Sequence, residues 1–239
     1  MSDVDFSLWV YLSRTPLLWL SVTLLAYGMT DSFSKKLNRH PLANPVLLAI
    51  LIIAGLLRLT GTPYRTYFEG AQFIHFLLGP ATVALAFPLY EHRETVKRAL
   101  LPMMVALIAG SITAFVSAVW IASILGIPRS MLLSLAPKSV TAGVAMGITE
   151  QLGGDPALTA VLVILTGITG AILATPLLNA LGIKDWRARG LAVGLAAHGI
   201  GTARAFQVHP IAGTFAGIAM GLNALLTAIL VPLAASFIR

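Results

Sequence analysis

The chain has 239 residues, of which 57% are hydrophobic and only 10% are charged, and its mean hydropathy is +0.88. Soluble globular domains carry about a quarter charged residues, so this composition excludes an ordinary soluble domain and predicts a polytopic membrane protein. The formal net charge of +7 does not indicate nucleic-acid binding, because the cations lie in short loops between apolar segments. The absence of cysteine excludes disulfides and thiolate chemistry.

Eight apolar segments follow one another along the chain, and each is predicted to be a helix: 15–33, 42–57, 68–90, 99–125, 130–149, 156–181, 188–206 and 211–237. The first twelve residues are too short to span a membrane and are expected to lie in its interface as an amphipathic anchor. We therefore expect an all-α fold with about seven or eight apolar segments, some broken or re-entrant, and a weak internal repeat. One integral membrane domain covers residues 1–239, with scaffold helices in 1–62 and the broken-helix motifs in 63–239.

Basic residues cluster after the first, third and sixth segments, at 35–39, 93–98 and 184–189. The positive-inside rule predicts that all three clusters are cytoplasmic. Three segments separate the last two clusters, so one segment must fail to cross once. The segment interrupted by Pro137 and Lys138 is the best candidate, either as a re-entrant loop or as two half-helices, which makes the N-terminus external and the C-terminus cytoplasmic. The alternative is that the charge bias arose by chance.

Two cations lie inside apolar segments beside helix breakers. Lys138 follows Pro137, and Arg204 follows Gly199 and Gly201. A charge at bilayer depth costs roughly 2.5 to 3.5 kcal/mol on insertion scales, so such residues usually bind something. Broken membrane helices also expose backbone N–H groups to anions, and Pro137 suits the first turn of such a half-helix.

A Gly-Pro-x-Thr element in the third segment resembles this pattern and suggests a third part of the same site. The candidate substrate-binding residues are Gly79, Pro80, Thr82, Pro137, Lys138, Ser139, Thr141, His198, Gly199, Gly201, Thr202 and Arg204. Three alternatives remain open: Lys138 and Arg204 snorkel to the interface, and His198 is a hydrogen-bonded structural residue.

Acidic residues are missing from the middle of every apolar segment, which disfavours a carrier of cations. Metalloprotease, serine-hydrolase and nucleotide-binding motifs are also missing, and the five histidines show no metal-ligand spacing. We expect neither an enzyme nor a cofactor nor a metal site. The GxxxG patterns at Gly143–Gly147 and Gly213–Gly221 predict close helix packing, either within the chain or across a dimer interface.

Three stretches resemble the signature sequences of the LrgB/CidB family: GPATVALAFPLYEH (79–92), LAPKSVTAGVAMGITEQLGG (135–154) and RARGLAVGLAAHGIGTARAF (187–206). The resemblance implies a multi-pass bacterial inner-membrane protein, often encoded with a small holin-like LrgA/CidA-type partner and linked to murein hydrolases and cell lysis. A related plant protein carries glycolate and glycerate across the plastid envelope, and bacterial relatives are tied to pyruvate uptake.

Two functions are therefore expected. The first is a secondary transporter of small monocarboxylates such as glycolate, glycerate, lactate or pyruvate, bound at broken-helix N-termini with Lys138 and Arg204. The alternative is an LrgB-type regulatory subunit that acts with a holin-like partner in murein hydrolase export and lysis control. A homodimer in the inner membrane, with no nucleic-acid partner, is expected in both cases.

Overall fold

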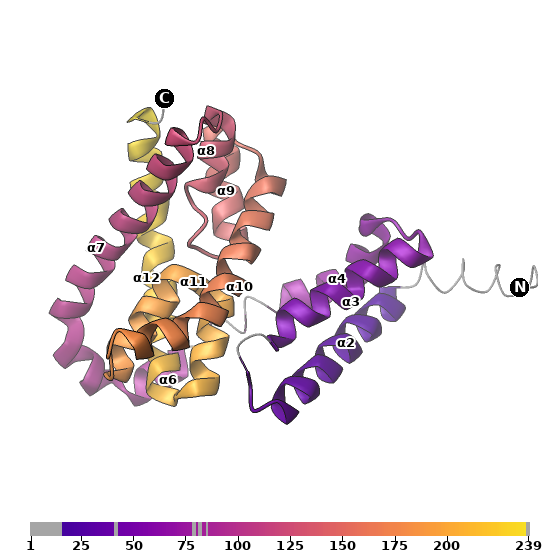
Figure 1. The fold of residues 1–239 in the computed structure, drawn as a ribbon, viewed down its shortest axis with the longest axis horizontal. Coiled ribbons are helices and arrows are strands. Elements are labelled where there is room, and N and C mark those ends of the chain that lie inside the picture. The colour runs from indigo at the N-terminus through magenta and orange to yellow at the C-terminus, as the bar shows by residue number, and fades with distance from the viewer. Residues whose placement is uncertain (1–15, 41–42, 78–79, 81–82, 85, 238–239) are drawn as a thin grey trace, which may run out of the picture. The chain divides into compact units, whose positions relative to one another are not determined.

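The computed structural model describes residues 16–40, 43–77, 80, 83–84 and 86–237, and all regular elements among them are helical. The chain divides into two compact units, Met1–Ala84 and Leu85–Arg239 (Figure 1). Three of the described helices are long and apolar enough to cross a membrane, Arg93–Ile124, Pro156–Ala180 and Pro210–Ala234, and Pro45–Thr60 is a shorter apolar helix. The all-helical class is confirmed, whereas seven or eight spans are not.

The first unit contains α2 (Pro16–Lys36), α3 (Pro45–Thr60) and α4 (Tyr64–Phe76). Trp19 of α2 is buried and meets Tyr67 of α4 edge to face, with ring centroids 5.8 Å apart. Gly70 permits this approach, because a methyl group there would lie 2.8 Å from Cβ of Trp19. The Thr30 hydroxyl donates to the Pro45 carbonyl oxygen at 3.0 Å and joins α2 to α3.

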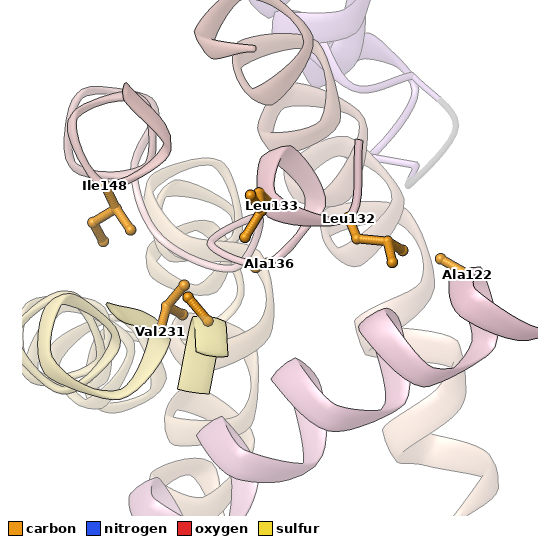
Figure 2. Packing of buried hydrophobic residues seen from close by; sticks show 7 residues of the cluster. Ala122, Leu132, Leu133, Ala136, Ile148 and Val231 are labelled. Carbon is orange, nitrogen blue, oxygen red and sulfur yellow. The ribbon is translucent and has the colours of Figure 1, made fainter. Parts of the chain in front are cut away.

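The second unit contains α6 (Ala86–Glu91), α7 (Arg93–Ile124), α8 (Arg129–Leu135), α9 (Ala142–Leu152), α10 (Pro156–Ala180), α11 (Trp186–Val208), α12 (Pro210–Ala234) and the 3-10 turn η1 (Ala235–Phe237). The long helices α7 and α12 run parallel. Val96 and Phe215 share a buried cluster near their starts, and Ala122 and Val231 share another near their ends. Figure 2 shows that this second cluster also takes side chains from α8 and α9.

The segment expected at 130–149 consists of two helices, α8 and α9, separated by non-helical residues 136–141. The Thr159 hydroxyl of α10 lies within hydrogen-bond distance of the Ser134 carbonyl oxygen (3.0 Å) and of the Thr149 hydroxyl (2.9 Å). Ser134 is the residue before the last of α8 and Thr149 lies in the last turn of α9, so the chain reverses between them. We call residues 129–152 the first hairpin.

The helix α11 also folds back on itself. Its first residue, Trp186, stacks on His209, which directly follows its last residue, with ring centroids 4.7 Å apart and planes 4° apart. A straight helix would separate these two residues by about 35 Å. The reversal occurs at His198, whose φ of 40° and ψ of −132° are non-helical. We call residues 186–208 the second hairpin. A break beside Gly199 and Gly201 was expected in the segment 188–206, but a reversal of the chain there was not.

Glycines bring the arms of the second hairpin together and onto α12. A methyl group on Gly194 would overlap the Ala216 carbonyl oxygen, so this arm lies directly on the α12 backbone. A methyl group on Gly201 would lie 2.6 Å from Cβ of Ala197 in the opposite arm. Close backbone packing of this kind needs small residues at the contact.

The segment expected at 68–90, with a break at its Gly-Pro-x-Thr element, is interrupted in the described residues by a turn at Leu77, where α4 has ended at Phe76; α6 begins at Ala86. The second unit has two ends. The C-terminal end of α12 lies at one of them, and the basic clusters 93–98 and 184–189 lie at the other. Arg98 and Arg187 line one groove, which puts the clusters 93–98 and 184–189 together, whereas Ala235 packs near the far end of α7. These clusters and the end of α12 therefore lie at opposite ends of the second unit, because α11 returns to the end where it began. The membrane sides expected for the two termini remain predictions.

Candidate functional site

The two hairpins meet beside the middle of α12, at the side chain of Asn223. This residue is only 1% exposed, and its amide nitrogen donates to the carbonyl oxygens of Ser139 and Leu195, both at 3.2 Å. Its amide oxygen accepts a hydrogen bond from the Ser111 hydroxyl of α7. One side chain thus connects the break in the first hairpin, the second hairpin just before its reversal, and α7.

Lys138 lies at the tip of the first hairpin. Its side chain is half-buried and its ammonium nitrogen lies 3.3 Å from the Ser139 hydroxyl oxygen. No ion pair involves Lys138 among the described residues. Pro137, beside it, is buried in the turn rather than in the first turn of α9, which begins only at Ala142. The expected position of this proline at the start of a half-helix is therefore wrong.

His198 lies at the tip of the second hairpin, three residues after Leu195, whose carbonyl oxygen accepts the hydrogen bond from Asn223. The imidazole is 4% exposed, and its Nε2 atom lies 2.9 Å from the Val163 carbonyl oxygen of α10. A methyl group on Gly167 would come within 2.7 Å of the ring, so α10 is shaped around it. The Thr202 hydroxyl donates to the His198 carbonyl oxygen at 2.8 Å. These contacts favour the structural role for His198.

Two helices start at the tips. The first residue of α9 follows Thr141, whose side chain makes no capping hydrogen bond, and the returning arm of α11 starts at Gly199. The first N–H groups of any helix lack intrahelical acceptors and carry the positive end of the helix dipole. Together with Lys138, the tips therefore present positive charge around the Asn223 junction, which suits an anion.

Arg204 lies away from this junction. It belongs to the returning arm, six residues or about 9 Å of helix beyond the tip, and it lines a small cavity with Arg189 and Trp186. Its Nη1 atom lies 3.5 Å from the Gln207 side-chain oxygen. The structure thus groups Arg204 with Arg189 rather than with Lys138.

The Gly-Pro-x-Thr element is placed only in part. Gly79 and Thr82 lie outside the described residues, and Pro80 is exposed in the first unit. The twelve sequence candidates therefore divide into a group at the hairpin tips, the separate Arg204, and this element.

Three residues that matter in the structure were missed at the sequence level: Ser111, Arg189 and Asn223. Asn223 interrupts one of the most apolar helices of the chain. A buried amide in a membrane helix bonds to its neighbours, so the reasoning that selected Lys138 also applies to it. Arg189 is buried although it belongs to a basic loop cluster, and no local signal separates it from its exposed neighbour Arg187.

The glycine patterns give different results. A methyl group on Gly213 would overlap the Phe206 ring, whereas Gly143 and Gly147 have no atoms of other residues within 4 Å of such a group. Close packing within the chain is thus found for Gly213 of α12, and the small-residue face of α9 is open.

Comparison with known proteins gives consistent matches over nearly the whole chain. A model of the LrgB-like family matches residues 23–237, which include both hairpins. The chain is 33% identical to the holin-like protein CidB of Staphylococcus epidermidis over 215 residues, 90% of this chain and 93% of that relative. It is 36% identical to YwbG of Bacillus subtilis (91% and 96% covered) and 31% identical to CidB of Staphylococcus aureus (90% and 94% covered). No solved structure matches it.

Proposed function

The chain belongs to the LrgB-like family, and from that membership we propose that it is a holin-like membrane subunit of the CidB type. It acts with a small LrgA/CidA-type membrane protein in murein hydrolase export and the control of cell lysis. The observation that carries this proposal is the similarity to proteins named holin-like CidB over about nine-tenths of both chains.

The open face of α9 suits such a partnership. Gly143 and Gly147 are exposed and lie one turn apart on the same helix. Membrane helices associate most closely where small residues let their backbones approach. A helix of the small partner, or of a second copy in a homodimer, therefore has room to pack there. We place the assembly in the inner membrane, with the basic clusters 93–98 and 184–189 on the cytoplasmic side.

Co-expression tests this function. The affinity-tagged chain is produced with and without a CidA-type protein in a bacterial host that lacks its own CidB-type gene. The tagged chain should retain the small protein after detergent extraction, and extracellular murein hydrolase activity, measured by zymography, should change only when both are present. Gly147→Leu should weaken retention, whereas Gly28→Leu, at an equally open helical glycine of α2, should not. Absence of both retention and hydrolase change contradicts the proposal.

A second candidate is a carrier of small monocarboxylates, and the meeting of the hairpin tips favours it. Paired broken segments that present helix N-termini at one point are the usual construction of a carrier's substrate site. Lys138 supplies a compact charge there, with the Ser139 hydroxyl beside it and the start of α9 just beyond Thr141. A purely regulatory subunit has no need of a half-buried cation inside an apolar segment.

Proteoliposome uptake of labelled glycolate, glycerate, lactate and pyruvate tests the carrier. Lys138→Met keeps the apolar stem and should leave folding intact while abolishing uptake. Lys138→Arg should be partly active, because a planar guanidinium does not reproduce a compact ammonium in a tight turn. Lys184→Met, at an exposed basic-loop residue, is the matched control and should transport normally. Uptake that is unchanged in Lys138→Met rules out this site.

A further inference from the structure

A groove lies between α7 and the first arm of the second hairpin, at the end of the second unit that carries the two basic clusters. Its volume of about 360 Å³ is within the roughly 300 to 1,000 Å³ that is typical of small-molecule sites. Three of its lining side chains are buried and apolar: Met103, Leu191 and Phe215. Neither candidate function uses this groove.

The charged residues lie at one end of the groove. On α7 the lining begins with Arg98 and continues to Ala106, eight residues or about 12 Å of helix further on. On the hairpin it begins with Asp185 and Arg187 and ends at Leu191. The remaining lining residues are apolar, and small ones among them leave the groove open.

The two charged ends lie together because α7 and the first arm of the hairpin run in the same direction. Met103 shares a buried cluster with Leu191. Further along both helices, a methyl group on Gly110 would lie 2.8 Å from a side-chain atom of Leu195. Both helices therefore lead away from the basic clusters, and the groove changes from charged to apolar along its length.

The charged end carries a net positive charge. Asp185, the one acid among the described residues that line the groove, pairs with Arg187 at 2.6 Å. Arg98 is exposed and forms no ion pair among the described residues. The acid one turn earlier on α7, Glu94, instead contacts Lys97 at 3.2 Å.

Arg98 also marks the edge of the apolar part of α7. Residues 99–128 contain no charge, and α7 is long and apolar enough to cross a membrane. A cation directly before such a stretch lies at the membrane–water interface. The charged end of the groove is thus expected at the level of the lipid headgroups and the apolar end at the depth of the acyl chains.

We propose that this groove binds one anionic phospholipid, with its phosphate at Arg98 and an acyl chain along Met103, Leu191 and Phe215. A guanidinium binds phosphate oxygens with paired hydrogen bonds, and basic pockets between membrane helices recognise anionic headgroups. A free phosphate would leave the apolar end unfilled, and an apolar helix would not use the charge. The site involves neither Lys138 nor a protein partner, so its test is independent of both candidate functions.

Native mass spectrometry of the purified full chain in a neutral detergent tests the proposal. The dissociation constant of the first bound lipid is measured for phosphatidylglycerol and for phosphatidylcholine with the same acyl chains. Phosphatidylglycerol should bind at least about fivefold more tightly, the factor that one basic residue contributes at an anionic lipid surface. Arg98→Gln should remove this preference. Arg58→Gln, at an exposed arginine of α3, removes the same charge and should bind as the wild type does.

Two further variants test the two ends of the groove. Asp185→Asn keeps a side chain that caps α11 and releases Arg187, so it should tighten phosphatidylglycerol binding. Ala106→Phe fills the apolar end from an exposed position and should weaken both lipids.

Three results overturn the proposal. Equal affinity of the wild type for the two lipids would indicate an apolar groove for a partner helix. Equal effects of Arg98→Gln and Arg58→Gln, or normal binding by Ala106→Phe, would place the lipid outside the groove. Glycerol phosphate that competes as well as the whole lipid would reduce the site to one for a free anion.

Discussion

The two hairpins of the second unit reverse the chain by different means. The first hairpin uses six non-helical residues around Pro137, and buried hydroxyls hold its ends together through Thr159. The second hairpin reverses at His198 alone and is held by glycine contacts and the aromatic stack at its base. The sequence marks a break in both segments, by Pro137 in the first and by Gly199 and Gly201 in the second, but it does not show that the chain reverses at His198.

The difference lies in where the stabilising interactions come from. Residues 136–141 leave the helix for local reasons, since proline removes a backbone donor and disfavours helix in the residue before it. His198 adopts a positive φ that costs a non-glycine residue about 1 to 3 kcal/mol. That cost is offset only by tertiary contacts, namely its hydrogen bond to Val163 and the packing of Gly194 against α12.

The largest expected effect is a crosslink that either forms completely or does not form, and it tests whether α11 folds back on itself. In this cysteine-free chain, Trp186→Cys combined with His209→Cys should react fully with a short bifunctional thiol crosslinker, because the two side chains lie side by side. Proteolysis between the two positions followed by gel electrophoresis reports the link. Ala197→Cys with His209→Cys, which joins the tip to the base, is the control and should not react. A straight α11 would leave the first pair unlinked as well.

A large stability effect is expected at the contact between the second hairpin and α12. Gly194→Ala should lower the free energy of unfolding by about 3 kcal/mol, since the added methyl group overlaps a backbone carbonyl that cannot move aside. The same change at Gly147, in the open face of the first hairpin, should stabilise by up to about 1 kcal/mol through helix propensity. Chemical unfolding in detergent measures both. Equal effects of the two changes would remove the distinction between the hairpins.

The junction shared by both hairpins should show an intermediate effect. Asn223→Leu leaves the buried carbonyl groups of Ser139 and Leu195 without their donor and should cost about 2 kcal/mol. Asn179→Leu, at an exposed position of α10, should change stability by less than about 0.5 kcal/mol. If Asn223→Leu is as stable as the wild type, Asn223 does not hold the two tips.

The smallest effect concerns pH at the start of the second hairpin. The hydrogen bond from Arg187 holds the pKa of Asp185 below its usual value. A depressed folded-state pKa stabilises the protein above the unfolded value of about 3.9, and this contribution fades as pH falls through the folded pKa. The pair is half-exposed, so the effect is small. Asp185→Asn should flatten the decline of the unfolding midpoint in this acid range, and Arg187→Gln should move the decline to higher pH. A decline that neither variant alters would exclude the pair.

Several predictions from the sequence agree with the structure because they rest on composition and local signals. The all-helical class follows from hydropathy, and the break after Leu135 follows from Pro137. The family resemblance is confirmed by the match over residues 23–237. The transport substrate, the holin-like partner and the dimer remain predictions.

What the sequence could not supply is the grouping of residues across helices. From the sequence, Lys138 and Arg204 were assigned to one site because both are cations beside helix breaks. The reversal at His198 instead carries Arg204 back to Arg189 at the base of the second hairpin.

The sequence by itself determined that the chain is a helical membrane-type protein of the LrgB-like family and where its breaks and cations lie, because hydropathy, proline and charge act locally. Only the tertiary structure decided that α11 returns to its starting end and that Asn223 joins the two tips. The physical reason is that a strained reversal and a buried amide are stable only when other helices supply close backbone contacts and hydrogen-bond partners.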